Sequence, residues 1–424
     1  MSFLHGIEIK EDDSGPRPIA SSNSAVIGVV GTVAGDFSKF PADVPVLIAG
    51  SRKDAERYGL SLENLEGQPP EETKPATKPK VKQKAEGEPD TATDVAQGET
   101  LPLQDPSGNN TTLEEDTLRY AINGILEQTG AMIVAVRAAD KTEANIINAI
   151  GALKGAESVV GQCPRILIAP GFSDSKLIRD KLGNVAEAVR GIAVIDGNDD
   201  VVHTNVATDI KDNYSDSRTY AVYPHVKVSC GEKGTREEPA SARVAGVIAK
   251  SDTQRGFWFS PSNQVMKGIV GTKYPIDFAL DSITSTANQL NNGNVATIIQ
   301  QNGYRLWGNR SCASDAKWQF ISVRRTADMI NDALLRSHLW AVDRNITKTY
   351  VEDVTEGVNA YLRHLKNTGA IINGKCWADI DKNTPDQIVQ GKIVFSFDFT
   401  PPYPAEHITF NSRLVNDYLV EIFA

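Results

Sequence analysis

Residues 165–195, RILIAPGFSDSKLIRDKLGNVAEAVRGIAVI, decide the fold class of this chain. Two short runs, Arg165–Ala169 and Ile192–Ile195, have the continuous apolar character of strands that are buried on both faces. Between them, Asp174–Arg190 has the mixed apolar and charged sequence of an amphipathic helix. A strand, a helix and a strand in this order predict two parallel strands joined by a crossover helix.

The same alternation extends to both sides of this unit. Further strands are expected at Ser24–Val33, Val44–Ala49, Ala131–Val136 and Thr219–Tyr223, and further helices at 51–59, 112–128, Glu143–Lys154 and 205–212. TLEE at Thr112–Glu115 has the pattern of a capping box, in which side chains satisfy the first backbone N–H groups of a helix. We therefore predict an α/β middle domain at residues 112–315, with a largely parallel sheet covered on both faces, and residues 21–65 as an N-terminal part of the fold.

The last third of the chain has a different pattern, typical of an α+β domain. A strand at Trp318–Val323 and helices at Arg325–Val342 and Tyr350–Leu365 are expected, followed by strands at Ala370–Trp377, Lys392–Phe399 and Arg413–Phe423. The second helix has an apolar stripe at helical spacing, formed by Val351, Val354, Val358, Tyr361 and Leu365. We predict a compact domain at residues 316–410 and an extended tail at 411–424.

Residues 66–111 differ from everything around them, being rich in Pro, Lys and Glu and free of aromatic residues. Such a segment buries too little apolar surface to offset the entropy of ordering its backbone, so we predict a polar, solvated insertion. Five lysines would suit an acidic partner: Lys74, Lys78, Lys80, Lys82 and Lys84. A solvated spacer is the alternative interpretation.

The composition excludes several classes of protein. A formal net charge of −10 argues against a general nucleic-acid binder, which needs a basic surface. The first residues lack a secretory signal, and no apolar run reaches the roughly 18 residues of a membrane span, so we expect a protein that stays soluble in the cytoplasm without membrane insertion. The four cysteines, Cys163, Cys230, Cys312 and Cys376, have neither zinc-site spacing nor a disulfide pattern.

No motif supports a cofactor or a catalytic site. Gly28, Gly31 and Gly35 follow a strand but lack dinucleotide-binding spacing, and there is no phosphate-binding P-loop. Residues Asp196–Asp200 begin like a calcium-binding EF-hand loop, yet the required Gly and Glu are absent, which favours an acidic turn. The isolated histidines and the missing G-x-S-x-G elbow argue against a hydrolase. We predict no metal, no cofactor and no catalytic residues.

Two aromatic runs allow two interpretations. GFWFSPSN at Gly256–Asn263 and YRLWGNR at Tyr304–Arg310 would suit a platform on which sugars or bases stack. Aromatic residues of a protein core are the alternative, and the more common one.

Six runs together resemble contractile tail sheath proteins, in the branch of phage P2-like tails and R-type pyocins. They are HGI (5–7), GFWFSPSN (256–263), KGIVGT (267–272), LNNGNVATII (290–299), GYRLWGNR (303–310) and WAVDRNITKTYVEDVTEG (340–357). The runs stand in the family's order and spread over the chain, whereas residues 66–111 look inserted relative to compact members. The resemblance implies a sheath subunit that is not an enzyme.

The resemblance also implies that both ends of the chain are arms that complete a β-sheet in neighbouring subunits. The N-terminal arm is expected at residues 1–20, with its strand at Gly6, Ile7, Glu8, Ile9 and Lys10. The C-terminal arm is expected at 411–424, with Leu414, Val415, Tyr418, Leu419 and Val420, and the receiving edge at Lys392, Ile393, Val394 and Phe395. Both ends are strand-like and follow or precede proline-containing hinges, and an unpaired strand needs a partner. A C-terminal strand that folds back within its own chain is the alternative.

For partners, the resemblance implies further copies of the chain, in a six-fold helical homopolymer, together with tail tube, baseplate and tail terminator proteins, but no direct contact with nucleic acid. The sheath would contract and drive the tube through the target envelope. We expect Arg324 and Arg325, a dibasic pair, to face an acidic tube. A phage, a bacteriocin and an extracellular injection system all remain open as the source of such a sheath, and an α/β hydrolase-like or nucleotide-binding enzyme is the competing class.

Overall fold

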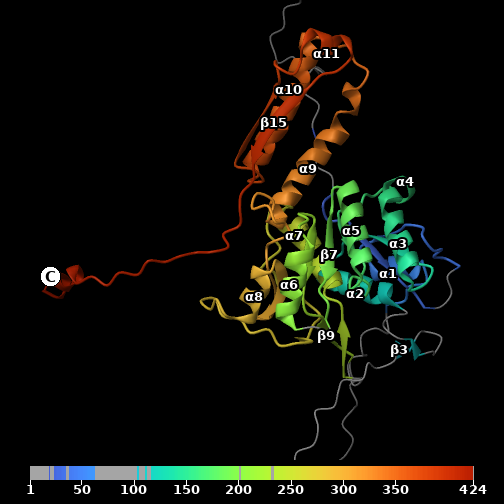
Figure 1. The fold of residues 1–424 in the computed structure, drawn as a ribbon, viewed down its shortest axis with the longest axis vertical. Helices are drawn as coiled ribbons and strands as arrows, with labels where there is room; N and C mark the ends of the chain where they lie inside the picture. The colour runs from blue at the N-terminus through green and yellow to red at the C-terminus, as the bar shows by residue number, and fades with distance from the viewer. Residues whose placement is uncertain are drawn as a thin grey trace, which may run out of the picture.

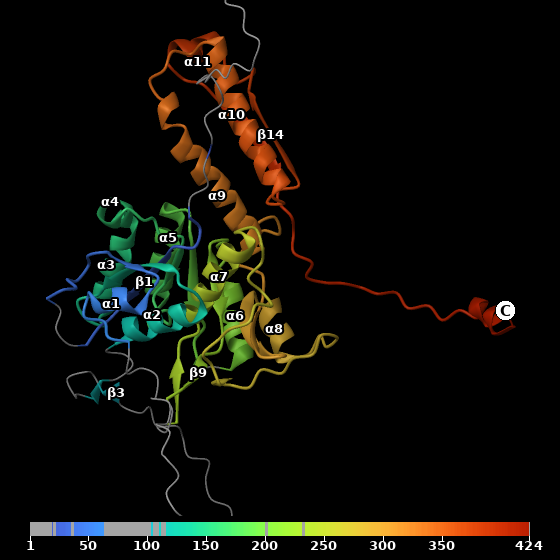
Figure 2. The same cartoon turned by 180° about the vertical axis from the view of Figure 1, so that it is seen from behind.

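The structure is a computed structural model, which describes residues 19, 23–34, 38–62, 103–104, 110–111, 116–199, 202–230 and 234–423. The expected strand at Gly6–Lys10, the expected capping box at Thr112–Glu115 and nearly all of residues 66–111 lie outside these ranges. The described residues form a broad α/β body, a narrower lobe that rises from it, and a C-terminal segment that runs away from both (Figures 1 and 2).

An eight-stranded sheet forms the centre of the body, in the order β13-β12-β8-β7-β6-β1-β5-β2. All neighbours pair in parallel except the two edge strands, β2 and β13. The strands are β1 (Ile27–Gly31), β2 (Val46–Ala49), β5 (Met132–Arg137), β6 (Ile166–Ile168), β7 (Ile192–Asp196), β8 (Thr219–Val222), β12 (Val295–Gln300) and β13 (Tyr304–Trp307). The predicted largely parallel sheet is therefore confirmed, and β1 and β2 join strands that follow residue 116.

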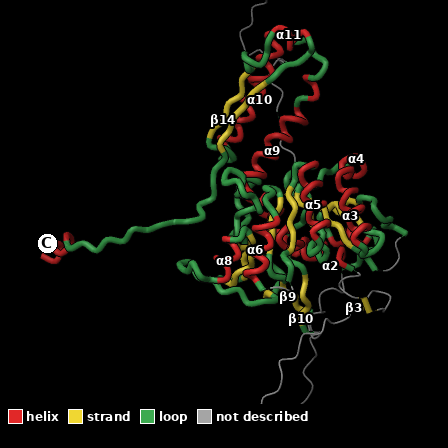
Figure 3. The backbone as a smooth tube through the Cα atoms, viewed as in Figure 1, coloured by secondary structure: helices red, strands yellow, loops and turns green. Residues whose placement is uncertain are grey.

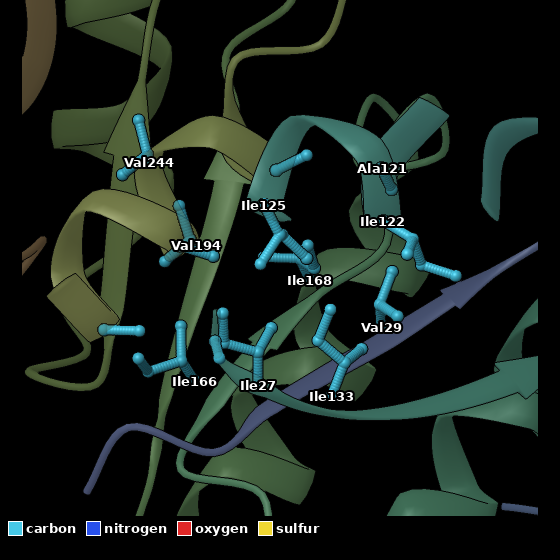
Figure 4. Packing of buried hydrophobic residues seen from close by; sticks show 14 of the residues in the cluster. Ile27, Val29, Ala121, Ile122, Ile125, Ile133, Ile166, Ile168, Val194 and Val244 are labelled. Atoms are coloured by element: carbon cyan, nitrogen blue, oxygen red, sulfur yellow. The ribbon is translucent and has the colours of Figure 1, made fainter. Parts of the chain in front are cut away.

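Helices cover both faces of this sheet. One face carries α2 (Thr117–Gln128) and α7 (Ser241–Arg255), and the other carries α3 (Glu143–Ala152), α5 (Lys176–Ala188), α6 (His203–Asn213) and α8 (Thr286–Asn292). Alternate residues of the same strand serve the two faces: Ile27 and Val29 join the core under α2 and α7, whereas Val26 and Val30 join the other. Figure 4 shows the first of these cores, in which Ile27, Val29 and Ile133 meet Ile122 and Ile125.

Close packing explains the glycines of the first strand. A Cβ atom at Gly28 would lie 2.9 Å from Leu167 Cδ2 and 2.9 Å from Pro164 Cβ, and one at Gly31 would collide with Thr117 Oγ1. Because β1 lies inside the sheet, between β6 and β5, helices and neighbouring strands approach its backbone from both sides. The glycine spacing thus reflects packing and gives no support to a nucleotide site.

Smaller elements complete the body. These are α1 (Arg52–Glu56), η2 (Leu153–Gly155), α4 (Ala156–Val160), a two-stranded sheet of β3 (Leu103–Gln104) and β4 (Asn110–Thr111), and a three-stranded antiparallel sheet of β9 (Val226–Ser229), β10 (Thr235–Glu238) and β11 (Gly271–Thr272). Among the described helices, none is long and apolar enough to cross a bilayer.

The lobe is built from two long helices, two short helical segments and a two-stranded sheet. It contains α9 (Ile321–Ser337), η4 (Leu339–Ala341), α10 (Lys348–Asn367), β14 (Asn373–Ala378), α11 (Pro385–Val389) and β15 (Phe395–Thr400). The apolar stripe predicted for α10 is buried at Val354, Val358, Tyr361 and Leu365, and it packs against α9 and the sheet. Mixed α and β structure in this part of the chain agrees with the prediction.

Two predicted elements are wrong. Trp318–Val323 is not a strand, because α9 begins at Ile321 and buries Ile321 and Val323 as a helix. Arg413–Phe423 is also not a strand. Residues 413–416 pair with no other strand, and Asp417–Phe423 forms the 3-10 helix η5. A strand needs a neighbouring strand, and nothing in the described chain lies beside this segment.

Candidate assembly site

The two-stranded sheet of the lobe is the expected receiving site. Strands β14 and β15 are antiparallel, with Asn373 opposite Thr400, Cys376 opposite Phe397 and Ala378 opposite Phe395. The rings of Phe397 and Phe399 stack at 6.1 Å on the side that faces the core of the lobe. Of the four residues expected to receive a strand, only Phe395 lies in β15, whereas Lys392, Ile393 and Val394 precede it.

The C-terminal segment leaves the lobe through a proline-rich turn and is then fastened to the body. Tyr403 packs edge-on against Phe320, with 6.1 Å between ring centres. Glu406 accepts two hydrogen bonds from Arg310, at 2.8 Å to Nε and 2.5 Å to the terminal nitrogen Nη2, and this contact raises the pKa of Arg310. These contacts join a residue late in the chain to the end of the central sheet.

Beyond Glu406, large apolar side chains are exposed. Ile408 is 65% exposed, Phe410 91% and Leu414 95%, and Tyr418, Leu419 and Ile422 are also exposed in η5. Figure 3 shows this segment as an extended loop that ends in a helical turn far from the lobe. Isolated apolar residues on a surface are common, but a row of them on an unpaired segment indicates a partner.

Arg324 and Arg325, the pair expected to face the tube, both make ion pairs within the chain. Arg325 is 4% exposed and binds both carboxylate oxygens of Asp252 in α7, as well as the carbonyl of Ser24. Arg324 pairs with Asp328 at 2.9 Å and stacks on the ring of Trp318. The interpretation of an exposed dibasic pair is wrong for Arg325, because its partner lies 73 residues earlier in the chain, where sequence spacing gives no indication of it.

Further ion pairs along α9 join the lobe to the body. Asp328 binds Arg218 with both oxygens, and Asp332 lies 2.6 Å from Arg165. Arg336, two turns after Asp328, binds Glu157 of α4, and this contact raises the pKa of Arg336 and lowers that of Glu157. Successive turns of one helix are therefore fixed to the body by charge-assisted hydrogen bonds.

The acidic turn after β7 is a structural element. Asp196 accepts hydrogen bonds from the backbone N–H of Ser241 at 2.8 Å and from its hydroxyl at 2.5 Å, while burial raises the pKa of Asp196. Asp199 pairs with Lys273 at 2.9 Å and with His225 at 3.3 Å. A cavity of about 230 Å³ lies beside these residues, and Asp199, His225 and Lys273 line it as one ion-paired group. Within the described ranges, no cluster of side chains could hold a metal ion.

The aromatic runs belong largely to packing. Phe257 is buried in the core of the lobe and meets Trp258 edge-on at 5.0 Å. Trp307 meets Phe278 in the same way at 4.9 Å. Only Phe259 is substantially exposed among the aromatic residues of Gly256–Asn263, which is too little for a stacking platform.

All four cysteines are free thiols, and three of them are buried. Burial raises the pKa of Cys312 to about 12, against about 8.5 for a free cysteine, so its thiol stays protonated in the folded chain.

We expect a thiol reagent at pH 8 to label the folded protein at Cys163 alone, and Cys163→Ser to abolish this labelling. Because Cys312 ionises only on unfolding, its burial lowers stability as the pH rises from about 8.5 toward 12. Rapid labelling of more than one thiol before unfolding would contradict this expectation.

Comparison with known proteins gives the family of the chain. A model of the phage tail sheath protein central domain matches residues 136–312, and a model of the phage tail sheath C-terminal domain matches residues 313–414. The chain belongs to the phage tail sheath family. The predicted resemblance is confirmed, as is the expectation of a structural protein rather than an enzyme.

Relatives and solved structures agree with the family over nearly the whole chain. A prophage major tail sheath protein of Pseudomonas aeruginosa is 36% identical, covering 100% of this chain and 99% of that protein. The tail sheath protein of Escherichia phage P2 is 28% identical, covering 99% and 98%. The contracted sheath of the extracellular contractile injection system PVC has a TM-score of 0.68 at 17% identity, covering 98% and 99%, and the contracted sheath of the anti-feeding prophage has 0.65 at 18%, covering 97% and 99%. The latter two share the sheath fold.

Proposed function

We propose that this tail sheath protein polymerises as a six-fold helical sheath around a tail tube and contracts to drive that tube through a target envelope. The observation that carries the proposal is the exposed apolar segment after Glu406, which has no partner among the described residues. A second copy of the chain supplies that partner. Relatives named as tail sheaths, and sheath-fold neighbours solved as helical assemblies, support the same conclusion.

In this proposal the chain has six parts: an N-terminal arm (1–20), an N-terminal part of the sheath domain (21–65), the polar insertion (66–111), a middle domain (112–315), a C-terminal domain (316–410) and a C-terminal arm (411–424). The N-terminal strand Gly6–Lys10 and the C-terminal arm residues Leu414, Val415, Tyr418, Leu419 and Val420 add to the small sheet of neighbouring lobes. Baseplate and tail terminator proteins contact the ends of the polymer, which assembles in the host cytoplasm.

Negative-stain electron microscopy of the purified chain at high concentration tests this proposal. Hollow tubes of stacked rings with cogwheel-shaped ends are the expected result. The chain is then co-expressed with a tube subunit, which should yield tubes of uniform bore. Small uniform particles in both preparations would remove the proposal.

The contact between Arg310 and Glu406 is expected to be weak in stability terms. Both side chains are about one-third exposed, so solvent and salt screen the pair. Arg310→Ala and Glu406→Ala should each lower the free energy of unfolding by less than about 1 kcal/mol, with a coupling of about 0.5 kcal/mol in the double variant. Urea unfolding at low and high salt measures this, and a coupling that survives 1 M salt unchanged would contradict it.

A further inference from the structure

A polar cavity of about 360 Å³ lies between the first turns of α5 and the length of α6. Both helices cover the same face of the central sheet (Figure 1). The loops after β6 and β7 contribute Asp174 and Asn198 to the wall of the cavity. The cavity therefore lies outside the carboxyl ends of two parallel strands, which is where open α/β sheets bind their ligands. Its volume falls within the range of small-molecule sites, about 300–1,000 Å³.

Helix α5 brings a buried cation with unused donors to this cavity. Arg179 is 4% exposed, its Nη1 binds Oδ2 of Asp209 at 3.2 Å, and its Nε donates to the carbonyl of Ser173. Its Nη2 makes no hydrogen bond within the described part of the chain. A guanidinium has five N–H donors, and leaving a buried donor unused costs free energy. An anion bound in the cavity would satisfy Nη2.

The ring of Tyr214 holds this cation and a second one. Nζ of Lys176 lies 5.1 Å from the ring centre and Cζ of Arg179 lies 5.5 Å from it, and both side chains line the cavity. Among the described residues, Asp209 is the one carboxylate that pairs with either cation, and it pairs with Arg179. Two cations beside one ring with a single carboxylate partner favour an anion between them.

The first turn of α5 adds backbone donors. The helix has 13 residues and begins after Ser175, whose hydroxyl accepts the N–H of Ile178. The first N–H groups of a helix, here those of Lys176 and Leu177, have no partner within the helix, and the helix dipole favours negative charge near them. The α5 side of the cavity therefore suits a carboxylate or a phosphate group.

Helix α6 lines the opposite side with groups that suit hydroxyls. Nδ2 of Asn213 donates to Oδ1 of Asp209 at 2.8 Å, which leaves the amide oxygen of Asn213 as an acceptor. The side chain of Asn205 makes no hydrogen bond within the described ranges, and it offers both donors and an acceptor. Asp174 lines the same cavity with a further carboxylate. Donors and acceptors that alternate in this way match the hydroxyl groups of a sugar, which both donate and accept.

We propose that this cavity binds an acidic sugar unit, with its anionic group at Arg179 and Lys176 and its hydroxyls at Asn205 and Asn213. The inference goes beyond sheath assembly and does not depend on tube formation. Two sources share this chemistry. A carboxylate belongs to a uronic acid, as found in surface polysaccharides, whereas a phosphate belongs to a free sugar phosphate.

Saturation-transfer NMR, which observes the ligand, tests the proposal on the full-length chain, because the method works with single subunits and with tubes. The probes are glucuronate, glucose 6-phosphate, neutral glucose and inorganic phosphate. We expect at least one of the two acidic sugars to bind with a Kd below about 1 mM, and glucose and inorganic phosphate to bind at least about tenfold more weakly. Tighter binding of glucuronate supports a polysaccharide as the source, and tighter binding of glucose 6-phosphate supports a free sugar phosphate.

Substitutions place the binding in this cavity. Lys176→Ala and Asn205→Ala, both at exposed positions, should each weaken binding of the acidic sugar at least about fivefold without a change in melting temperature. Lys211→Ala is the matched control, since Lys211 is an exposed cation on α6 that does not line the cavity, and it should stay within about twofold of the unsubstituted chain. Arg179→Lys keeps the charge but loses Nη2, and it should weaken binding further.

Three results would overturn the proposal: no binding of either acidic sugar at about 10 mM, binding of glucose or inorganic phosphate as tight as that of the acidic sugars, or unchanged binding in both Lys176→Ala and Asn205→Ala. The sheath function stands in each case, because tube formation is measured separately by electron microscopy.

Discussion

A chain cut after Glu406 is expected to fold normally and to form no connected tubes. The residues removed, 407–424, include exposed Ile408, Phe410 and Leu414 and make few contacts with the rest of the chain. Deleting them should shift the melting temperature by no more than about 2 °C, because no buried apolar surface is lost. In the proposed assembly, loss of the arm removes the strand that joins neighbouring subunits, so tube yield should fall to background.

The position of the cut matters. Ending the chain after Thr400 would also remove Tyr403 and Glu406, which contact Phe320 and Arg310, and would mix a stability effect with the assembly effect. A full-length control, Ile408→Ser with Phe410→Ser, keeps the chain length but removes apolar side chains from one face of the arm. We expect it to assemble poorly as well. Tubes of normal yield from the chain cut after Glu406 would show that the arm is dispensable.

The central sheet could be predicted from the sequence because its strands are buried on both faces. Such strands are continuous apolar runs, and in this chain Ile166–Ile168 and Ile192–Asp196 are wholly buried as that pattern requires. Helix α10 could be predicted equally well, since its apolar stripe faces a single core. In each case the information lies within a few residues of the element itself.

The predictions that failed depended on distant partners. Ile321 and Val323 could belong to a strand or a helix, and only their packing beneath the lobe makes them part of α9. Arg325 was interpreted as an exposed charge because Asp252, its partner, is remote in sequence. An asparagine within a helix gives no indication of a distant contact in the sequence, yet Asn359 accepts a hydrogen bond from the backbone N–H of Cys376. The segment Arg413–Phe423 has strand-like sequence but no strand beside it in a single chain.

Removal of Arg325 is expected to be the most destabilising single change at the junction of body and lobe. Its side chain is 5% exposed and that of Asp252 is 1% exposed, and the hydroxyl of Ser24 donates a further hydrogen bond to Asp252 at 2.6 Å. Arg325→Ala would leave the Asp252 carboxylate buried and without its counter-charge. Breaking a buried pair in this way costs about 3–5 kcal/mol, a large fraction of the stability of a typical domain.

Two further variants distinguish the cost of leaving the Asp252 carboxylate buried without a partner from the cost of losing one cation. Arg324→Ala, one residue away, leaves Asp328 paired with Arg218, so it should lower the free energy of unfolding by only about 1–2 kcal/mol. A double variant, Arg325→Met with Asp252→Leu, removes both charges and should recover much of the loss, because no unpaired ion remains in the interior. Urea unfolding followed by tryptophan fluorescence measures all three. Equal effects of Arg325→Ala and Arg324→Ala would mean that the Asp252 pair does not fasten α9 to the body. The ion pairs of Asp328, Asp332 and Arg336 would then hold the helix there.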